Sequence, residues 1–267
     1  MNLQNPKKFK LLIDQAHQVA IKVLRPISRK YDKAEHSYPK ELDMLASLVD
    51  GMNAGAAVGK RGTNEQGNKN GVNLSTALSV IEMCYGDTAL LLSMPRQGLG
   101  NSAIAAVANE EQLERFKNTW AAMAITEPNC GSDSAAIRTT ATKVGDDYIL
   151  NGEKIFVTSG ERADAIVVWA TLDKKLGRSA IKSFVIPKGT AGMTVERLEH
   201  KLGIKASDTA VIRLIDCRVP ANNLLGNAEI DIAKGFAGVM ETFDNTRPLV
   251  AAMAIGCAKA SLERIKE

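Results

Sequence analysis

The hydrophobic residues of this chain change their spacing near Trp120, and this change constrains the fold more than any other sequence feature. Before it, apolar residues such as Leu12 and Ala16 recur at intervals of three or four, which is the spacing of an amphipathic helix. After it, apolar residues alternate or form short runs such as 165–171, which is typical of strands. Helical spacing returns after Gly226. The sequence therefore predicts helices, then strands, then helix.

This order predicts an α+β protein with several domains. We expect an N-terminal all-α domain over 1–118 and a small β-sandwich or barrel over 119–228, because the short strand patterns there are separated by frequent turns. Residues 229–267 read as the first helix of a C-terminal helical bundle. That helical pattern reaches Glu267 without a Gly or Pro stop signal, so we expect the C-terminal domain to be truncated.

Several local signals refine this outline. Pro26 is expected to interrupt the first helical run and Pro248 to kink or restart the last one, because proline removes a helical hydrogen bond. Residues 88–108 are expected to form one helix, and 51–71, rich in Gly and Asn, a long polar loop. The pair Asn151-Gly152 is the strongest short signal for a hairpin turn.

The composition excludes several classes of protein. A net charge of +4 with only 4% aromatic residues is too weak a signature for a nucleic-acid-binding protein. The four cysteines and three histidines are scattered, so we expect neither a zinc site nor a disulfide framework, and a cytoplasmic location. No apolar run approaches the ~20 residues of a membrane-spanning helix, and the first ten residues lack the apolar core of a signal peptide.

The stretch 124–133 lies where the helical pattern gives way to the strand pattern. A short apolar run ends there in Thr, Glu, Pro, Asn, Cys, Gly, Ser and Asp. A strand that ends in hydroxyls and a Gly-containing bend can present N–H and O–H groups to one polar ligand. Loops of this composition are also common as plain connections between domains, and local chemistry leaves both interpretations open.

Four motifs in a fixed order resemble the acyl-CoA dehydrogenase family of flavoproteins. The resemblance covers nearly the whole chain and is strongest between 121 and 256. Three positions depart from the usual family pattern: Cys130 replaces a Gly, Ala, Ser or Asn, Phe156 replaces a Trp, and Lys205 replaces an Arg. The motifs are Ala-Ile-Thr-Glu-Pro-Asn-Cys-Gly-Ser-Asp at 124–133, Asn-Gly-Glu-Lys-Ile-Phe-Val-Thr-Ser-Gly at 151–160, Lys-Leu-Gly-Ile-Lys-Ala-Ser-Asp-Thr at 201–209 and Phe-Asp-Asn-Thr-Arg-Pro at 243–248.

The resemblance implies a function. It implies an FAD-dependent oxidoreductase of fatty acid β-oxidation that converts an acyl-CoA thioester to a trans-2-enoyl-CoA. It also implies electron-transfer flavoprotein as the electron acceptor, and a homodimer or homotetramer for the full-length protein. The acyl chain length cannot be read from the motifs.

The resemblance also implies site residues. Thr126 and Thr158 are expected to donate their hydroxyls to the flavin ring, and Phe156 to flank it. The Gly131-Ser132 turn is expected to meet the FAD pyrophosphate, with Ser132 also on the substrate side. The full set of expected FAD-binding positions is Met123, Ile125, Thr126, Gly131, Ser132, Phe156, Val157 and Thr158, and that of acyl-CoA-binding positions is Ser132, Asp244, Thr246 and Arg247.

Each of these residues also has a plainer interpretation. Thr158 is a common strand residue, Phe156 can be a core residue, and Arg247 can be a solvated helix charge. Glu127 is expected to be a structural carboxylate, and Cys130 to be unreactive.

No catalytic residue is assigned, because Thr246 stands where a minority of the family carries the catalytic Glu and the majority position lies beyond residue 267. Three hypotheses follow. The chain is a fragment of a full-length dehydrogenase, or a naturally short module that binds FAD or CoA without catalysis, or a relative that performs oxidase or monooxygenase chemistry.

Overall fold

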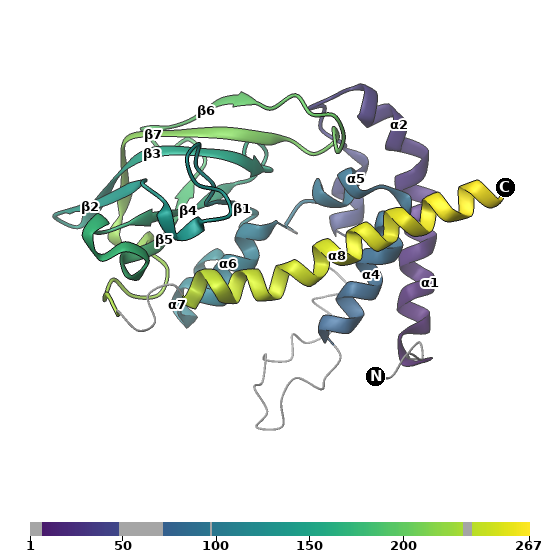
Figure 1. The fold of residues 1–267 in the computed structure, drawn as a ribbon, viewed down its shortest axis with the longest axis horizontal. Coiled ribbons are helices and arrows are strands. Elements are labelled where there is room, and N and C mark those ends of the chain that lie inside the picture. The colour runs from purple at the N-terminus through teal and green to yellow at the C-terminus, as the bar shows by residue number, and fades with distance from the viewer. Residues whose placement is uncertain (1–6, 48–71, 97, 232–236) are drawn as a thin grey trace. The chain divides into compact units, whose positions relative to one another are not determined.

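The computed structural model describes residues 7–47, 72–96, 98–231 and 237–267 (Figure 1). The predicted polar loop at 51–71 lies outside these residues. The chain forms two compact units. The helical unit contains Met1–Met94, Gly203–Ala206 and Arg247–Glu267, and the β unit contains Pro95–Leu202 and Ser207–Thr246.

The helical unit packs short helices around an aliphatic core. Its core includes Leu24, Leu42 and Leu90. Helices α1 and α4 lie side by side (Figure 1), and a Cβ built on Gly86 would lie 2.7 Å from the carbonyl oxygen of Ala20. The close approach of these segments therefore requires a glycine. The elements are η1 (Lys7–Phe9), α1 (Lys10–Val19), η2 (Ala20–Leu24), α2 (Arg25–Lys33), a helical turn at 41–47, α4 (Val72–Gly86), α5 (Thr88–Leu92) and the C-terminal part of α8 (Ala237–Lys266).

The predicted interruption at Pro26 is wrong, because the helical path continues from α1 to α2. The segment between them, Ala20–Leu24, is a π-helix. Pro26 sits in the first turn of α2, where a residue without an N–H is tolerated. A wider π turn before the proline thus lets one helical path pass a residue that would break a regular α-helix.

The β unit is built on a curled seven-stranded sheet (Figure 1). Strand β4 is buried along its whole length and lies between β1, with which it runs parallel, and its antiparallel partner β5. Helix α6 packs near β1 (Figure 1). The strands are β1 (Ala121–Ala124), β2 (Thr140–Val144), β3 (Asp147–Thr158), β4 (Ala165–Thr171), β5 (Ile181–Pro187), β6 (Met193–Leu198) and β7 (Thr209–Pro220); the helices are α6 (Leu99–Val107), α7 (Glu110–Phe116), η3 (Ser134–Ala136), η4 (Lys174–Ala180) and η5 (Ala221–Asn223).

The predicted hairpin turn at Asn151-Gly152 is wrong. The turn lies at Gly145-Asp146, and Asn151-Gly152 is an irregularity inside the continuous strand β3. Gly152 has a φ of +155°, and Asn151 exchanges hydrogen bonds with Asp216 on β7 (3.1 and 2.8 Å). Two residue steps of β3, from Leu150 to Gly152, oppose three steps of β7, from Cys217 to Leu214, so the Asn-Gly pair faces a β-bulge whose extra residue lies on β7.

The predicted single helix over 88–108 is also wrong. It is two helices, because α5 ends at Leu92 and α6 begins at Leu99. Pro95 lies between them, and Arg96 has a φ of +61°, a left-handed conformation that no helix accommodates.

Helix α8 continues through Pro248 as one element, so the chain does not restart there. The division between the two compact units falls inside this helix, between Thr246 and Arg247. Among the described helices, none combines the length and hydropathy needed to cross a bilayer.

Candidate functional site

Two of the sequence motifs meet where β1 ends. The N–H of Ile155 on β3 donates a hydrogen bond to the carbonyl oxygen of Thr126, just beyond β1 (2.9 Å). The motif at 124–133 and the motif at 151–160 are therefore adjacent in the β unit, although a full hairpin separates them in the sequence.

The segment Ile155-Phe156 is a β-bulge in β3. The pairing of β3 with β7 shifts between Lys154 and Val157, and Phe156 has a φ of +58°. The side chain of Phe156 is 61% exposed, so the predicted core interpretation of this ring is wrong. An aromatic residue in the left-handed region is strained, and strain of this kind concentrates at functional sites. The bulge exposes an aromatic ring at the residue that follows Ile155, whose N–H is bonded to Thr126.

Three motif hydroxyls are available at this place. Thr126 and Thr158 are half-buried and Ser132 is exposed. In the part of the chain that the structure describes, none of their hydroxyls has a protein hydrogen-bond partner. A Cβ built on Gly131 would meet only the methyl group of Thr126, at 3.9 Å, so the fold itself does not require a glycine there. The space beside Gly131 is open to a ligand.

The apolar members of the predicted FAD set face the protein interior. Ile125 belongs to the core cluster of the β unit and Met123 packs against it, while Val157 is 1% exposed. Ile125 and Val157 can therefore line a ligand site only through their backbone groups, whereas Met123 is partly buried.

Glu127 and Lys154 form a buried ion pair beneath this surface. Lys154 is fully buried, and its Nζ lies 2.7 Å from Oε1 of Glu127 and 3.1 Å from the carbonyl oxygen of Ile125. Glu127 also accepts hydrogen bonds from the N–H of Arg138 (2.7 Å) and from the N–H and hydroxyl of Thr139 (2.9 and 2.6 Å). The carboxylate therefore joins three segments, which confirms the prediction that Glu127 is structural.

The pKa values of this cluster follow from burial and charge. Burial alone would raise the pKa of Glu127, but the charge of Lys154 and the hydrogen bonds to the carboxylate outweigh it and lower that pKa. Burial lowers the pKa of Lys154, and Glu127 opposes the change. Burial next to Glu127 raises the pKa of the Cys130 thiol, as expected for an unreactive cysteine.

Lys154 is the residue that the sequence reasoning missed. Its signal is the strand alternation, because Tyr148 and Leu150 point inward on β3 and Lys154 occupies the next inward position after Gly152. A lysine at an inward strand position needs a buried partner, and that requirement points to Glu127.

The predicted acyl-CoA residues on α8 have mixed environments. Asp244 and Arg247 are exposed, and Arg247 belongs to the helical unit. Thr246 is buried, and its hydroxyl donates to the carbonyl oxygen of Thr242 one turn earlier (3.0 Å). The hydroxyl of Thr246 therefore donates its proton to an intrahelical hydrogen bond.

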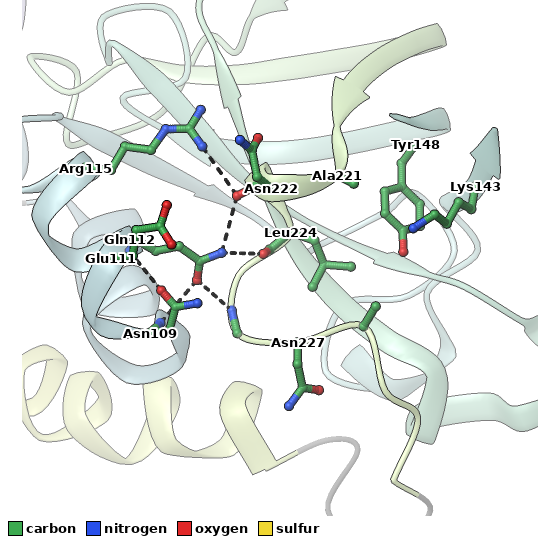
Figure 2. A pocket seen from close by; sticks show the side chains of 12 residues that line it. Asn109, Glu111, Gln112, Arg115, Lys143, Tyr148, Ala221, Asn222, Leu224 and Asn227 are labelled. Carbon is green, nitrogen blue, oxygen red and sulfur yellow. Dashed lines mark hydrogen bonds between the residues drawn. The ribbon is translucent and has the colours of Figure 1, made fainter. Parts of the chain in front are cut away.

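Two pockets in the β unit lie apart from the motif hydroxyls. One, of about 260 Å³, has α7 residues on one side and Tyr148 and Lys143 on the other (Figure 2). A second, of about 450 Å³, includes Ala135, Arg138, Thr171 and Lys174 in its lining. Neither pocket is lined by a residue predicted to bind FAD or acyl-CoA.

Comparison with known proteins gives a consistent set of similarities. Residues 122–217 match the family described as acyl-CoA dehydrogenase, middle domain. The whole chain is 32% identical to the short-chain specific acyl-CoA dehydrogenase of Clostridium acetobutylicum and covers 69% of it.

Solved structures agree with the sequence matches. The structure of butyryl-CoA dehydrogenase from Megasphaera elsdenii is similar to 98% of this chain, with a TM-score of 0.83 at 33% identity over 69% of that protein. A chain in a structure of the electron transferring flavoprotein of Acidaminococcus fermentans gives a TM-score of 0.82 at 33% identity, over 98% of this chain and 68% of that one. The chain spans 61–69% of the length of the first curated relatives.

Proposed function

Because the chain belongs to the acyl-CoA dehydrogenase family, we propose that it is the flavin-binding part of an enzyme that introduces an α,β double bond into a fatty acyl-CoA thioester. The family consists of FAD-dependent flavoproteins. The chain covers about two thirds of the length of its relatives. We therefore propose the activity for the whole protein and not for these residues alone.

One observation carries the proposal. The hydrogen bond between Ile155 and Thr126 gathers the strained, exposed Phe156 and an unpartnered Thr126 hydroxyl at one surface. The open space beside Gly131 lies next to them. A flavin needs an apolar face, hydrogen-bond donors at its polar edge and room for its pyrophosphate, so these residues fit FAD.

The residues of this chain would bind and orient the reactants. The hydroxyls of Thr126 and Thr158 would donate hydrogen bonds to the ring, and Phe156 would cover one part of it and exclude water. Gly131 and Ser132 would meet the pyrophosphate, while Asp244 and Arg247 would contact acyl-CoA. When bound, FAD supplies the acceptor for the β-hydrogen. We propose three domains, with boundaries at 118/119 and 228/229.

The wider setting of the enzyme is proposed from the same family. Electrons would pass to an electron-transfer flavoprotein, in keeping with the structural similarity to a chain from such a system. The full-length protein would be a homodimer or homotetramer that acts in fatty acid β-oxidation. Its cysteines are free thiols, which agrees with a reducing compartment such as the cytoplasm.

A second candidate function is a flavin- or CoA-binding module without dehydrogenase activity. Glu127, the glutamate of the first motif, does not supply a base for this chain, because its oxygens accept hydrogen bonds from Arg138, Thr139 and Lys154. A carboxylate bound in this way is unsuited to removing a substrate proton. Oxidase chemistry is the third alternative, and oxygen consumption during turnover would reveal it.

FAD binding tests the proposal directly. We expect the chain to quench FAD fluorescence on titration, and Thr158→Val to weaken the affinity about tenfold through the loss of one hydrogen bond. Thr142→Val, an exposed substitution on β2, is the matched control and should leave the affinity unchanged. Equal affinities for both variants would contradict the assignment of Thr158.

Catalysis by this chain alone is a separate question. We expect no bleaching of bound flavin by an acyl-CoA, since no base is assigned. Bleaching would show that a residue of this chain acts as the base. The intact mass of the native protein would distinguish a fragment from a naturally short chain.

A further inference from the structure

We propose that the buried Lys154–Glu127 ion pair is a positioning device for the flavin-facing surface, and that it is retained for this role rather than for stability. The inference rests on the proposed FAD function. It assigns two residues that contact neither reactant but hold the segments that do.

The first argument is connectivity. Nζ of Lys154 donates a hydrogen bond to the carbonyl oxygen of Ile125 (3.1 Å). The N–H of Ile155 donates one to the carbonyl oxygen of Thr126 (2.9 Å). Two successive peptide groups around Thr126 are therefore fixed from β3. Since Lys154 directly precedes the bulge that displays Phe156, the same contacts set the spacing between Thr126 and Phe156.

The second argument is that the carboxylate restrains another segment. Glu127 accepts three hydrogen bonds from Arg138 and Thr139, which lie just after the Gly131-Ser132 turn. The loop that carries Gly131 and Ser132 is thus anchored at both ends to one carboxylate. A neutral side chain in place of Glu127 offers fewer acceptors and leaves the loop less restrained.

The third argument concerns energy. Both side chains are buried, at 0% and 7% exposed, and removing charges from water offsets much of the attraction between them. A buried pair of this kind is often no more stabilising than neutral residues of similar size, whereas removal of one partner is strongly destabilising. Stability alone therefore does not explain the pair.

The test separates positioning from stability with a double-mutant cycle. Lys154→Met, Glu127→Gln and the double variant are compared by urea unfolding and by FAD titration. We expect each single variant to unfold at lower urea than the double variant, because each leaves one unpaired charge. We expect the double variant to bind FAD about tenfold more weakly than the wild-type chain and to show an altered absorption spectrum of the bound flavin.

The control changes a surface ion pair at the other end of the same strand. Arg218 and Asp147 are paired at 2.9 Å and are partly exposed. Arg218→Met with Asp147→Asn should leave FAD affinity and the flavin spectrum unchanged.

Two outcomes would overturn the proposal. One is a double variant that binds FAD with the affinity of the wild-type chain. The other is an FAD affinity that changes in parallel with resistance to urea unfolding across all variants. If the double variant does not fold, Thr139→Val, which removes a single hydrogen bond to Glu127, should weaken FAD binding a few-fold, and unchanged binding again overturns the proposal. A wild-type chain that fails to bind FAD refutes the proposed function itself and is distinguishable from these results.

Discussion

Phe156 combines backbone strain with an exposed aromatic ring. Its φ of +58° is a conformation that most side chains avoid, and its ring is 61% exposed, so core burial does not compensate for the strain. Ser159, three residues later, also has a positive φ, of +60°. Two residues with a left-handed backbone therefore flank Val157 and Thr158, one inside β3 and one directly after it.

This strain can be measured. We expect Phe156→Gly to be more stable than Phe156→Ala by about 1 kcal/mol, because both lack the ring and only glycine adopts the left-handed region without cost. Urea unfolding of the two variants checks this. Both should lose FAD affinity to a similar extent, and a more stable Ala variant would show that the backbone is not strained there.

Gly152 is a second residue with a specific steric role. An added Cβ would lie 2.8 Å from Cα and Cβ of Thr139, and Thr139 is held by Glu127. We expect Gly152→Ala to reduce the free energy of unfolding by about 2–4 kcal/mol. Gly145→Ala is the control, since Gly145 has a φ of +61° but no atom within 4 Å of the added Cβ. It should cost only about 1 kcal/mol, and equal losses would contradict the steric explanation.

At the scale of elements, α7 is attached to the segment 222–226 by two side chains, Gln112 and Arg115, and Arg115 donates to Oδ1 of Asn223 (2.7 Å). Gln112 completes a capping box with Asn109, donates to the carbonyl oxygen of Leu224 (2.7 Å) and accepts from the N–H of Gly226 (2.9 Å), as Figure 2 shows. A buried amide that both donates and accepts is needed here, because the segment around Leu224 offers both kinds of partner.

This arrangement predicts that a negative charge at residue 112 weakens the attachment of α7 to the segment around Leu224. Gln112→Glu keeps the size of the side chain but cannot donate to Leu224 when ionised, so we expect a loss of about 2–3 kcal/mol at pH 7 that partly recovers below the carboxyl pKa. Asn109→Ala removes only the cap and should cost about 1 kcal/mol at either pH. Chemical unfolding at pH 7 and pH 4 checks both, and a pH-independent loss in Gln112→Glu would argue against the lost donor.

The sequence predicts most elements of the β unit, because their patterns depend on local burial. The run 165–171 is β4, as expected from its continuous apolar pattern. Asn151-Gly152 was misassigned because the pair faces a bulge on β7 inside a continuous strand, and only the pairing with β7 reveals this. The π turn before Pro26 likewise depends on contacts that one segment does not reveal.

The candidate site was predictable only in part. Thr126, Gly131 and Phe156 follow from motif positions, and the structure brings their segments together. The Lys154–Glu127 contact joins residues far apart in the sequence, so neither motif alone identifies it. The burial of Thr246 also needed the structure, because it depends on tertiary packing, whereas the bond of its hydroxyl to Thr242 is a local contact one helical turn away.

At the scale of the whole molecule, the Glu127 cluster makes stability depend on pH. Burial alone would raise the pKa of the Glu127 carboxyl, but Lys154 and the hydrogen bonds outweigh it, so folding lowers this pKa. The ionised carboxylate therefore stabilises the fold above the unfolded pKa of about 4.3, and this stabilisation is lost as pH falls through the folded pKa. We expect the free energy of unfolding of the β unit to fall below about pH 4.3, and Glu127→Gln to show a shallower fall. Parallel curves for the two proteins would contradict this.

The parallel pairing of β1 with β4 also sets an order of events during synthesis. Strands β2 and β3 are joined by a tight turn and can pair as soon as both have been made. Strand β1 comes earlier in the chain, yet it has to wait for β4. The segment holding Thr126 is thus made before its partner strand exists, and a nascent chain cannot capture its cofactor until the ribosome has passed residue 171.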